Sequence, residues 1–210
     1  MENYIESLNW RYATKKYDPS KKVSAQDLET LKEAVQLSVS SMGLQPYRIL
    51  IIENPEIRQK LKAAGYNQDG ITESSQLFVF AYEKNVSEKH VDAYIENISK
   101  VREVEKESLK PFENTINGFI NNQTEEGKNT WAAKQTYIAL STLINTAALL
   151  KIDATPMEGF NAQQFDEILG LDKLGLSTAV IAAVGYRHEE DGFQHFKKVR
   201  KPQNELFITI

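Results

Sequence analysis

The sequence predicts an α+β sandwich, in which a small mixed β-sheet is flanked by helices. Short apolar runs rich in β-branched and aromatic residues alternate with longer segments of helical periodicity. The segment 126–150 has the length of a helix and too much apolar character for a surface helix, so it should be a buried hub of the fold or of a dimer. The alternation of strands and helices is too irregular for a regular βαβ array.

The first half of the chain predicts helices at 1–10, 24–38 and 55–64, and strands at 48–52 and 77–82. Ser24 followed by Asp27 resembles a helix-capping pattern, so a helix should begin there. Asn54 and Pro55 should end the strand that precedes them. The run 77–82 is apolar throughout and rich in aromatic residues, which indicates a buried strand.

The second half predicts a charged helical segment at 87–110, an ambiguous stretch at 112–122, the helix at 126–150, a connector at 153–161, a helix at 162–169 and a central strand at 178–184. The last run, 206–210, is apolar and rich in β-formers. It predicts a terminal strand that pairs with another subunit. We therefore expect one domain over 1–210, with a helical excursion around 87–122.

Composition narrows the classes of function. The 210 residues carry a formal net charge of −4, with 41% hydrophobic and 26% charged residues, as in ordinary globular proteins. No long basic stripe offsets this charge, so nucleic acid is not an expected partner. The chain has no cysteine, which excludes disulfides and thiolate metal sites and fits a cytoplasmic protein. The three histidines lie far apart without metal-ligand spacing, so no metal is expected.

Membrane and nucleotide-fold signatures are not expected either. The N-terminus has no signal-peptide pattern, and the apolar run 137–150 is too short and too interrupted by polar residues to span a membrane. The sequence contains no G-x-G-x-x-G, no phosphate-binding G-x-x-x-x-G-K-[ST] and no G-x-S-x-G. Standard dinucleotide folds, P-loop proteins and serine hydrolases are therefore disfavoured.

Two clusters of positive charge stand out on this acidic chain. Arg11 and Lys15 lie close together near the start, and 197–201 contains Lys198 and Arg200. If both clusters converge on one anion, that anion is a small phosphorylated molecule. The alternative from charge alone is that 197–201 is a solvated basic tail and Lys15 an ordinary surface lysine.

Five motifs in order carry a resemblance to a known family. They are 11–15, 38–41 followed by Gln45 and Pro46, Asn67, 156–159, and 198–200 before 202–204. On these motifs the chain resembles the FMN-dependent nitroreductase family, in its oxygen-insensitive, dihydropteridine-reductase-like branch, over nearly its whole length. The resemblance implies a nitroreductase-like sandwich, a homodimer with active sites at the interface, and a C-terminal strand exchanged between subunits.

The resemblance also implies roles for individual residues. Arg11, Lys198 and Arg200 would bind the FMN phosphate, and Lys15 would face the N1/O2 edge of the flavin, where a fixed cation stabilises the reduced form. Asn67 would bond the pyrimidine end. Backbone groups of the turn Pro156, Met157, Glu158 and Gly159 would face flavin N5. The remaining cofactor-binding positions are Tyr12 and Ala13, and, from the neighbouring subunit, Ser38, Val39 and Ser40.

Some positions depart from the family pattern. Ala13 replaces a frequent serine, so a hydroxyl contact is lost. Gly70 replaces a lysine near the nicotinamide, which leaves the choice between NADH and NADPH open. Met42, Gly70 and Phe119 are the candidates at the substrate mouth. Phe119 is either an aromatic lid over the flavin or a core or interface residue.

The implied activity is two-electron ping-pong transfer. NAD(P)H would reduce the flavin and leave, and a small electron-poor acceptor, such as a nitroaromatic or a quinone, would then be reduced. No side chain needs to act as a general acid, because solvent can supply protons. Two alternatives remain: a flavin-binding protein without turnover, and a flavin-destroying or dehalogenating relative on the same scaffold.

Overall fold

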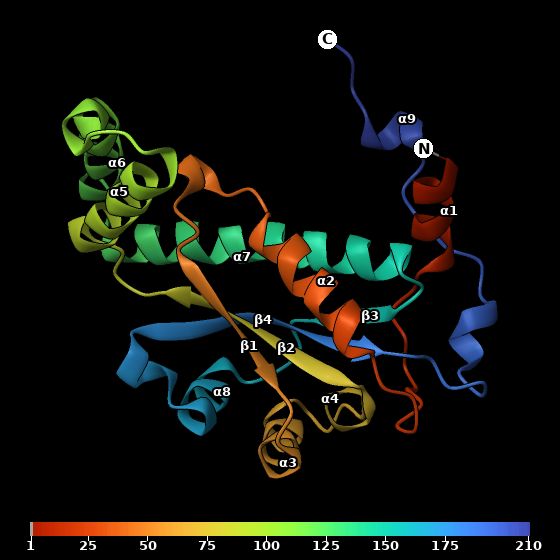
Figure 1. Cartoon of the computed structure of the whole chain (residues 1–210). Helices are drawn as coiled ribbons and strands as arrows, with labels where there is room; N and C mark the ends of the chain where they lie inside the picture. Colours follow the sequence, from red (N-terminus) through yellow and green to blue (C-terminus); the bar gives the residue numbers. More distant parts are fainter. Residues whose placement is uncertain (1) are drawn as a thin grey trace.

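The computed structural model describes residues 2–210 and contains a four-stranded sheet between two layers of helices (Figure 1). The strands lie in the spatial order β1-β2-β4-β3, and each neighbouring pair is antiparallel. The α+β class is confirmed, but the expected mixed sheet was wrong. Strand direction depends on the sheet end to which the connecting helices return the chain, and local sequence does not fix that end. The strands are β1 (Tyr47–Ile52), β2 (Gln76–Glu83), β3 (Asp153–Met157) and β4 (Leu176–Gly185).

Helices cover both faces of the sheet. Helices α2 and α7 lie on one face, α3, α4 and α8 lie on the other, and α5 and α6 pack on each other beyond one end of the sheet (Figure 1). The helices are α1 (Glu2–Trp10), α2 (Ala25–Gln36), α3 (Pro55–Ala64), α4 (Gly70–Glu73), α5 (Glu88–Arg102), α6 (Lys110–Asn121), α7 (Glu125–Leu149), α8 (Ala162–Leu169) and α9 (Gln203–Leu206). Single 3-10 turns occur at Ser41–Gly43, Lys106–Leu109, Leu171–Leu174 and Gly192–His195.

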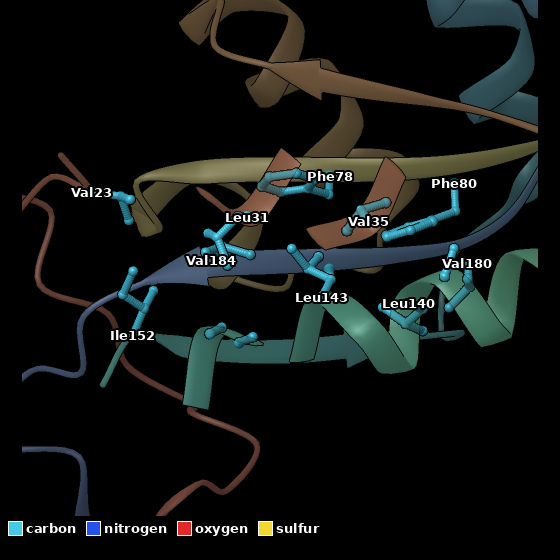
Figure 2. Packing of buried hydrophobic residues seen from close by; sticks show 14 residues of the cluster. Val23, Leu31, Val35, Phe78, Phe80, Leu140, Leu143, Ile152, Val180 and Val184 are labelled. Atoms are coloured by element: carbon cyan, nitrogen blue, oxygen red, sulfur yellow. The ribbon is translucent and has the colours of Figure 1, made fainter. Parts of the chain in front are cut away.

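The alternation of side chains along β2 separates two cores. Phe78 and Phe80 are at most 1% exposed and pack with Leu143 of α7 on one face (Figure 2). Leu77 and Val79 are fully buried on the opposite face, in the core that α3, α4 and α8 cover. This period of two explains why the predicted strand 77–82 is apolar throughout: both of its faces are buried.

Most predicted helices begin where local signals place them. The Ser24 hydroxyl accepts the Asp27 N–H at 3.0 Å and caps α2, as expected. The predicted helix 87–110 is divided instead, because α5 ends at Arg102 and the next residue, Glu103, has a left-handed φ of 54°. The ambiguous stretch is helical, because it belongs to α6, which begins at Lys110. Pro111 lies in the first turn of this helix, where a missing N–H costs nothing.

One expectation about strands was wrong, and a second depends on a partner subunit. The connector predicted at 153–161 begins with strand β3, which is an edge strand and therefore tolerates Pro156. Within one subunit, residues 206–210 form no strand: Leu206 ends α9, and Phe207 and Ile208 are 68% and 84% exposed. The predicted pairing of this run with another subunit stays a prediction. An apolar run forms a strand only where a ladder partner is present, and 206–210 has none among residues 2–210.

Helix α7 is buried on one side only. Ala139 and Leu143 are fully buried, whereas Tyr137 and Ile138 are 40% and 38% exposed. One side of α7 therefore packs in the core, and apolar residues on its other side remain exposed. Among residues 2–210, no helix combines the length and apolar character that a membrane crossing requires.

Arg58 of α3 fixes the chain just before β2. Its side chain is 5% exposed. Its Nε donates to the Ile71 carbonyl at 2.6 Å, and its Nη2 donates to the carbonyl and hydroxyl oxygens of Ser74, both at 2.7 Å. Burial lowers the pKa of Arg58, and these neutral acceptors stabilise the charged form. Arg58 thus holds the loop that leads from α4 into the sheet.

Replacing Arg58 with methionine should lower the free energy of unfolding by about 3 kcal/mol, because buried carbonyl groups would lose their donors. Urea unfolding measures this change. Lys60→Met is the matched control, since Lys60 lies on the same helix and is exposed, and it should change stability by less than about 0.5 kcal/mol. Equal, small effects of the two substitutions would show that the Arg58 hydrogen bonds do not hold the loop.

Candidate functional site

The two sequence neighbours of Arg11 are aromatic, and both stack on another arginine, Arg187. The ring centroids of Trp10 and Tyr12 lie 4.3 Å and 4.5 Å from the guanidinium carbon of Arg187. Arg187 in turn binds the buried carboxylate of Asp153, with Nη2 to Oδ1 at 2.7 Å. Arg187 is therefore occupied by the protein itself, whereas Arg11 lines a cleft.

Arg11, Lys198 and Arg200 form a cationic cluster. All three line one cleft of about 310 Å³, the basic cleft, together with Lys15. The Lys198 ammonium donates to the Arg11 carbonyl oxygen. The structure thus brings the two predicted clusters of positive charge together, although nearly the whole chain separates them in sequence.

The electrostatics of the cationic cluster favour an anion. Burial lowers the pKa of Arg11, and the Arg200 charge lowers it further. The pKa of Lys198 is lowered by burial and by both arginines. The Arg11 Nε is buried and has no hydrogen-bond partner among residues 2–210. Three mutually repelling cations with an unused donor form a site that a phosphate-like group would stabilise.

A second cleft continues from Arg11 toward the end of β3. This β3 cleft has a volume of about 500 Å³ and is lined by Arg11, by Pro156, Met157 and Glu158, and by residues of α1, α7 and β4. Both volumes lie within the usual range of small-molecule pockets. Arg11 lines both clefts, so the two clefts adjoin at this residue.

Glu158 is the acidic residue of the β3 cleft. Its carboxylate accepts a hydrogen bond from the hydroxyl of Tyr137 on α7. Burial and this bond raise the pKa of Tyr137 to about 12, so the tyrosine stays a proton donor. The turn after β3 is thus tied to α7 through Glu158.

Gln68 was missed by the sequence analysis and supports the same turn. Its side-chain amide donates to the Gly159 carbonyl at 2.7 Å, which joins the loop after α3 to the turn after β3. Asn67 beside it is exposed, has a left-handed φ of 58°, and donates its backbone N–H to the Lys62 carbonyl. Asn67 lines neither the basic cleft nor the β3 cleft. A lone glutamine in a loop carries no sequence signal for this tether.

Two buried aspartates were also missed. Asp153 accepts hydrogen bonds from the Thr14 hydroxyl at 3.1 Å as well as from Arg187. Asp191 accepts the Lys15 N–H at 2.7 Å and the Tyr12 hydroxyl at 3.0 Å. Burial raises the pKa of Asp191, but its hydrogen bonds outweigh burial and leave the pKa below its usual value. Burial and the same bond raise the pKa of Tyr12 to about 12.

Lys15 and Ala13 complete the basic cleft. Lys15 is exposed, and its ammonium lies 5.8 Å from the ring centroid of Phe193. Ala13 lines the same cleft without a hydroxyl. Gly70 packs against the buried ring of Tyr17, where an added Cβ would lie 3.4 Å from a ring carbon. A Cβ at position 70 would thus be at ordinary contact distance, so packing at the Cβ does not explain why glycine stands there in place of lysine.

The remaining predicted residues lie outside the two clefts of this chain. The Ser38 hydroxyl accepts from Thr142 on the α2 side of α7, and the Ser40 hydroxyl accepts the Gln45 N–H. Val39 is 74% exposed. Met42 packs with the α5 and α6 core, and Phe119 packs edge-on against Trp131 at 5.4 Å between ring centroids. Within one subunit, Phe119 is thus a packing residue of the excursion.

Comparisons with known proteins identify the family and the fold. The family model described as "Nitroreductase family" matches residues 8–186. A Staphylococcus haemolyticus protein assigned as an NAD(P)H nitroreductase is 36% identical, and the alignment covers 100% of this chain and 98% of that protein. A Bacillus subtilis structure assigned as a nitroreductase has a TM-score of 0.89 at 20% identity, with 100% of both chains covered. An Exiguobacterium sibiricum structure in complex with FMN, also assigned as a nitroreductase, has a TM-score of 0.84 at 20% identity and covers 99% of this chain and 97% of that one.

Inorganic phosphate should raise the thermal stability of the protein without cofactor, because an anion in the basic cleft relieves repulsion within the cationic cluster. The gain is about 1.4 kcal/mol at about ten times the dissociation constant for phosphate. Thermal unfolding in phosphate, against sodium chloride of equal ionic strength, measures it.

Lys198→Met should lose most of this gain. Lys201→Met is the matched control, because Lys201 is exposed in the same segment, does not line the basic cleft and should keep the gain in full. A Lys198→Met protein that responds to phosphate as strongly as the unmodified chain would show that the cluster does not bind the anion.

Proposed function

The chain belongs to the nitroreductase family, and from this premise we propose that it is an FMN-dependent oxidoreductase that uses NAD(P)H to reduce nitroaromatic, quinone or similar electron-poor compounds. One observation carries the proposal: the basic cleft and the β3 cleft meet at Arg11. The cationic cluster lies at one end of this path, and Pro156, Met157 and Glu158 lie at the other. The arrangement matches a flat ring system with a phosphate at one end.

The residues present fit FMN. Its phosphate would be held by Arg11, Lys198 and Arg200, and the unpartnered Arg11 Nε supplies a donor that the protein itself does not use. Its ring would extend from the basic cleft, where Lys15 lies, into the β3 cleft, over the apolar surface to which Met157 and Leu140 contribute. Tyr12, Ala13 and Asn67 are the further residues that we assign to the cofactor from the family pattern.

When bound, FMN supplies the redox chemistry, accepting a hydride equivalent from NAD(P)H and passing two electrons to the acceptor. The chain contributes binding and electrostatics. Lys15 would hold a fixed positive charge near the ring edge that becomes negative on reduction, which favours the reduced state. The segment from Pro156 to Gly159, at the end of β3 and in the turn after it, would orient the reacting face. Protons can come from solvent, since the β3 cleft is open.

We also propose that the active protein is a homodimer in the cytoplasm. Apolar surface that the single chain leaves open supports the dimer, namely the outer face of α7 at Tyr137 and Ile138, Val39, and the C-terminal run 206–210. In this arrangement Ser38, Val39 and Ser40 would reach the cofactor of the partner, and 206–210 would find there the strand pairing that it lacks in its own subunit.

Purified protein should contain FMN at one per chain and lose its yellow colour on anaerobic addition of NADH or NADPH. An acceptor such as a nitroaromatic or a quinone should restore the colour and yield the reduced product. A protein that cannot be loaded with FMN would exclude the proposal, and one that binds FMN without oxidising NAD(P)H would be a binding protein. Breakdown of the flavin under oxygen, or loss of halide from a halogenated substrate, would indicate the flavin-destroying or dehalogenating alternative.

Arg200→Ala should weaken FMN binding by about 1.5–3 kcal/mol, the loss of a charge-assisted hydrogen bond. Fluorescence titration of the cofactor-free protein measures this change. Lys201→Ala, one residue further along the same tail, should bind FMN as the unmodified chain does. Equal affinities of the Arg200→Ala and unmodified proteins would show that the tail is merely solvated.

Deleting residues 206–210 should weaken the dimer, because this apolar segment is exposed within its own subunit and would be buried against the partner. Light scattering over a range of protein concentrations measures the dissociation. Leu174→Ser is the control, as it removes an exposed leucine, 63% accessible, from a 3-10 turn. A truncated protein with unchanged dimer affinity would contradict the role of this segment.

A further inference from the structure

Asp191 is a buried carboxylate that the proposed chemistry does not use. It is 2% exposed and lies in the loop after β4. Its Oδ2 accepts from the Tyr12 hydroxyl at 3.0 Å and from the N–H groups of Lys15 and Lys16 at 2.7 Å and 3.1 Å. Its Oδ1 accepts the Phe193 N–H at 3.1 Å. All four donors are neutral groups, so the charge of Asp191 orients peptide and phenol groups rather than neutralising a cation.

These bonds join the two cationic parts of the basic cleft. Lys15 and Lys16 belong to the segment 11–16, whereas Phe193 begins the segment 193–200 that carries Lys198. Asp191 also fixes both partners of the contact between the Lys15 ammonium and the Phe193 ring. One carboxylate therefore bonds to both segments and helps to set how they lie relative to each other.

A second buried carboxylate holds the same N-terminal segment from its other side. Asp153 binds the Thr14 hydroxyl and the side chain of Arg187, which is stacked on Trp10 and Tyr12. Residues 10–14 are thus fixed at the sheet by Asp153. Asp191 links this segment to 193–200, in addition to the bond from Lys198 to the Arg11 carbonyl oxygen.

We propose that Asp191 is a positioning residue that holds the segments 11–16 and 193–200 in their anion-binding arrangement before the ligand arrives. This inference rests on the proposed function, in which the anion is the phosphate of FMN and Lys15 acts on its ring. Such preorganisation removes part of the ordering cost of binding.

The sign of the effect separates positioning from simple charge. A carboxylate near an anion site repels the anion, so its removal should tighten FMN binding and make the bound flavin easier to reduce if charge alone acts. If Asp191 positions the cations, its removal should weaken FMN binding and make the bound flavin harder to reduce. The two accounts thus predict opposite changes from one substitution.

Asp191→Asn should raise the dissociation constant for FMN about tenfold, the loss expected for about one charge-assisted hydrogen bond. The affinity for riboflavin, which lacks the phosphate, should change less. If the stabilisation of the reduced over the oxidised flavin by Lys15 also falls about tenfold, the two-electron midpoint potential falls by about 30 mV. Fluorescence titration and anaerobic dye equilibration measure these quantities.

Asp166→Asn is the matched control. Asp166 is 6% exposed and accepts bonds from the Thr178 N–H and hydroxyl at 2.8 Å and 2.7 Å, on α8 away from the basic cleft. It should lose stability as Asp191→Asn does, without a change in FMN affinity or potential. A merely structural role of Asp191 would make the two variants behave alike, and would overturn the inference. Tighter FMN binding or a higher potential in Asp191→Asn would overturn it as well.

A second variant and a measurement on the unmodified protein test the inference even if Asp191→Asn does not fold. Asp191→Glu keeps the charge and moves it by one methylene group, so positioning predicts weaker FMN binding and charge alone predicts no change. In the unmodified protein without FMN, the amide hydrogens of Lys15 and Lys16 should already exchange slowly; fast exchange there would refute preorganisation. An unmodified protein that binds no FMN would instead refute the proposed function, and slow exchange of these two amides would still show the role of Asp191 in the fold.

Discussion

Two buried carboxylates, Asp153 and Asp191, hold the chain after α1 against the sheet, and the arrangement of the site depends on them. An ionised carboxylate away from water is strongly destabilising unless donors surround it. Thr14 and Arg187 supply the donors at Asp153, and Tyr12, Lys15, Lys16 and Phe193 supply them at Asp191. Satisfying these two groups fixes the path of the segment that carries Arg11.

This constraint explains how like charges can be gathered in a cleft. Arg11, Lys198 and Arg200 repel one another, as the lowered pKa values of Arg11 and Lys198 indicate. Hydrogen bonds of the surrounding backbone hold the segments together despite that repulsion, including the bond from Lys198 to the Arg11 carbonyl. An anion that enters the basic cleft therefore meets donors that are already in place.

The same constraint connects the two ends of the site. Asp153 is the first residue of β3, and Pro156 and Met157 are its last two. An extended strand has a nearly fixed rise per residue, so anchoring Arg11 through Asp153 also sets its separation from the turn at Glu158. In our proposal this separation suits the distance between the phosphate and the ring of the cofactor. The tethers from Tyr137 and Gln68 then hold the turn itself.

The sequence by itself determined the positions of most helices and strands and the family, because capping residues, periodicity and ordered motifs are local signals. It also indicated the site residues that the structure brings together, Arg11, Lys15, Lys198 and the turn after Met157. Tertiary structure alone decided the strand directions, the strand β3, the unpaired run 206–210, and the burial of Asp153 and Asp191. These features depend on partners far away in the chain, and a single aspartate in a loop has the same local pattern whether it ends in solvent or at the centre of a site.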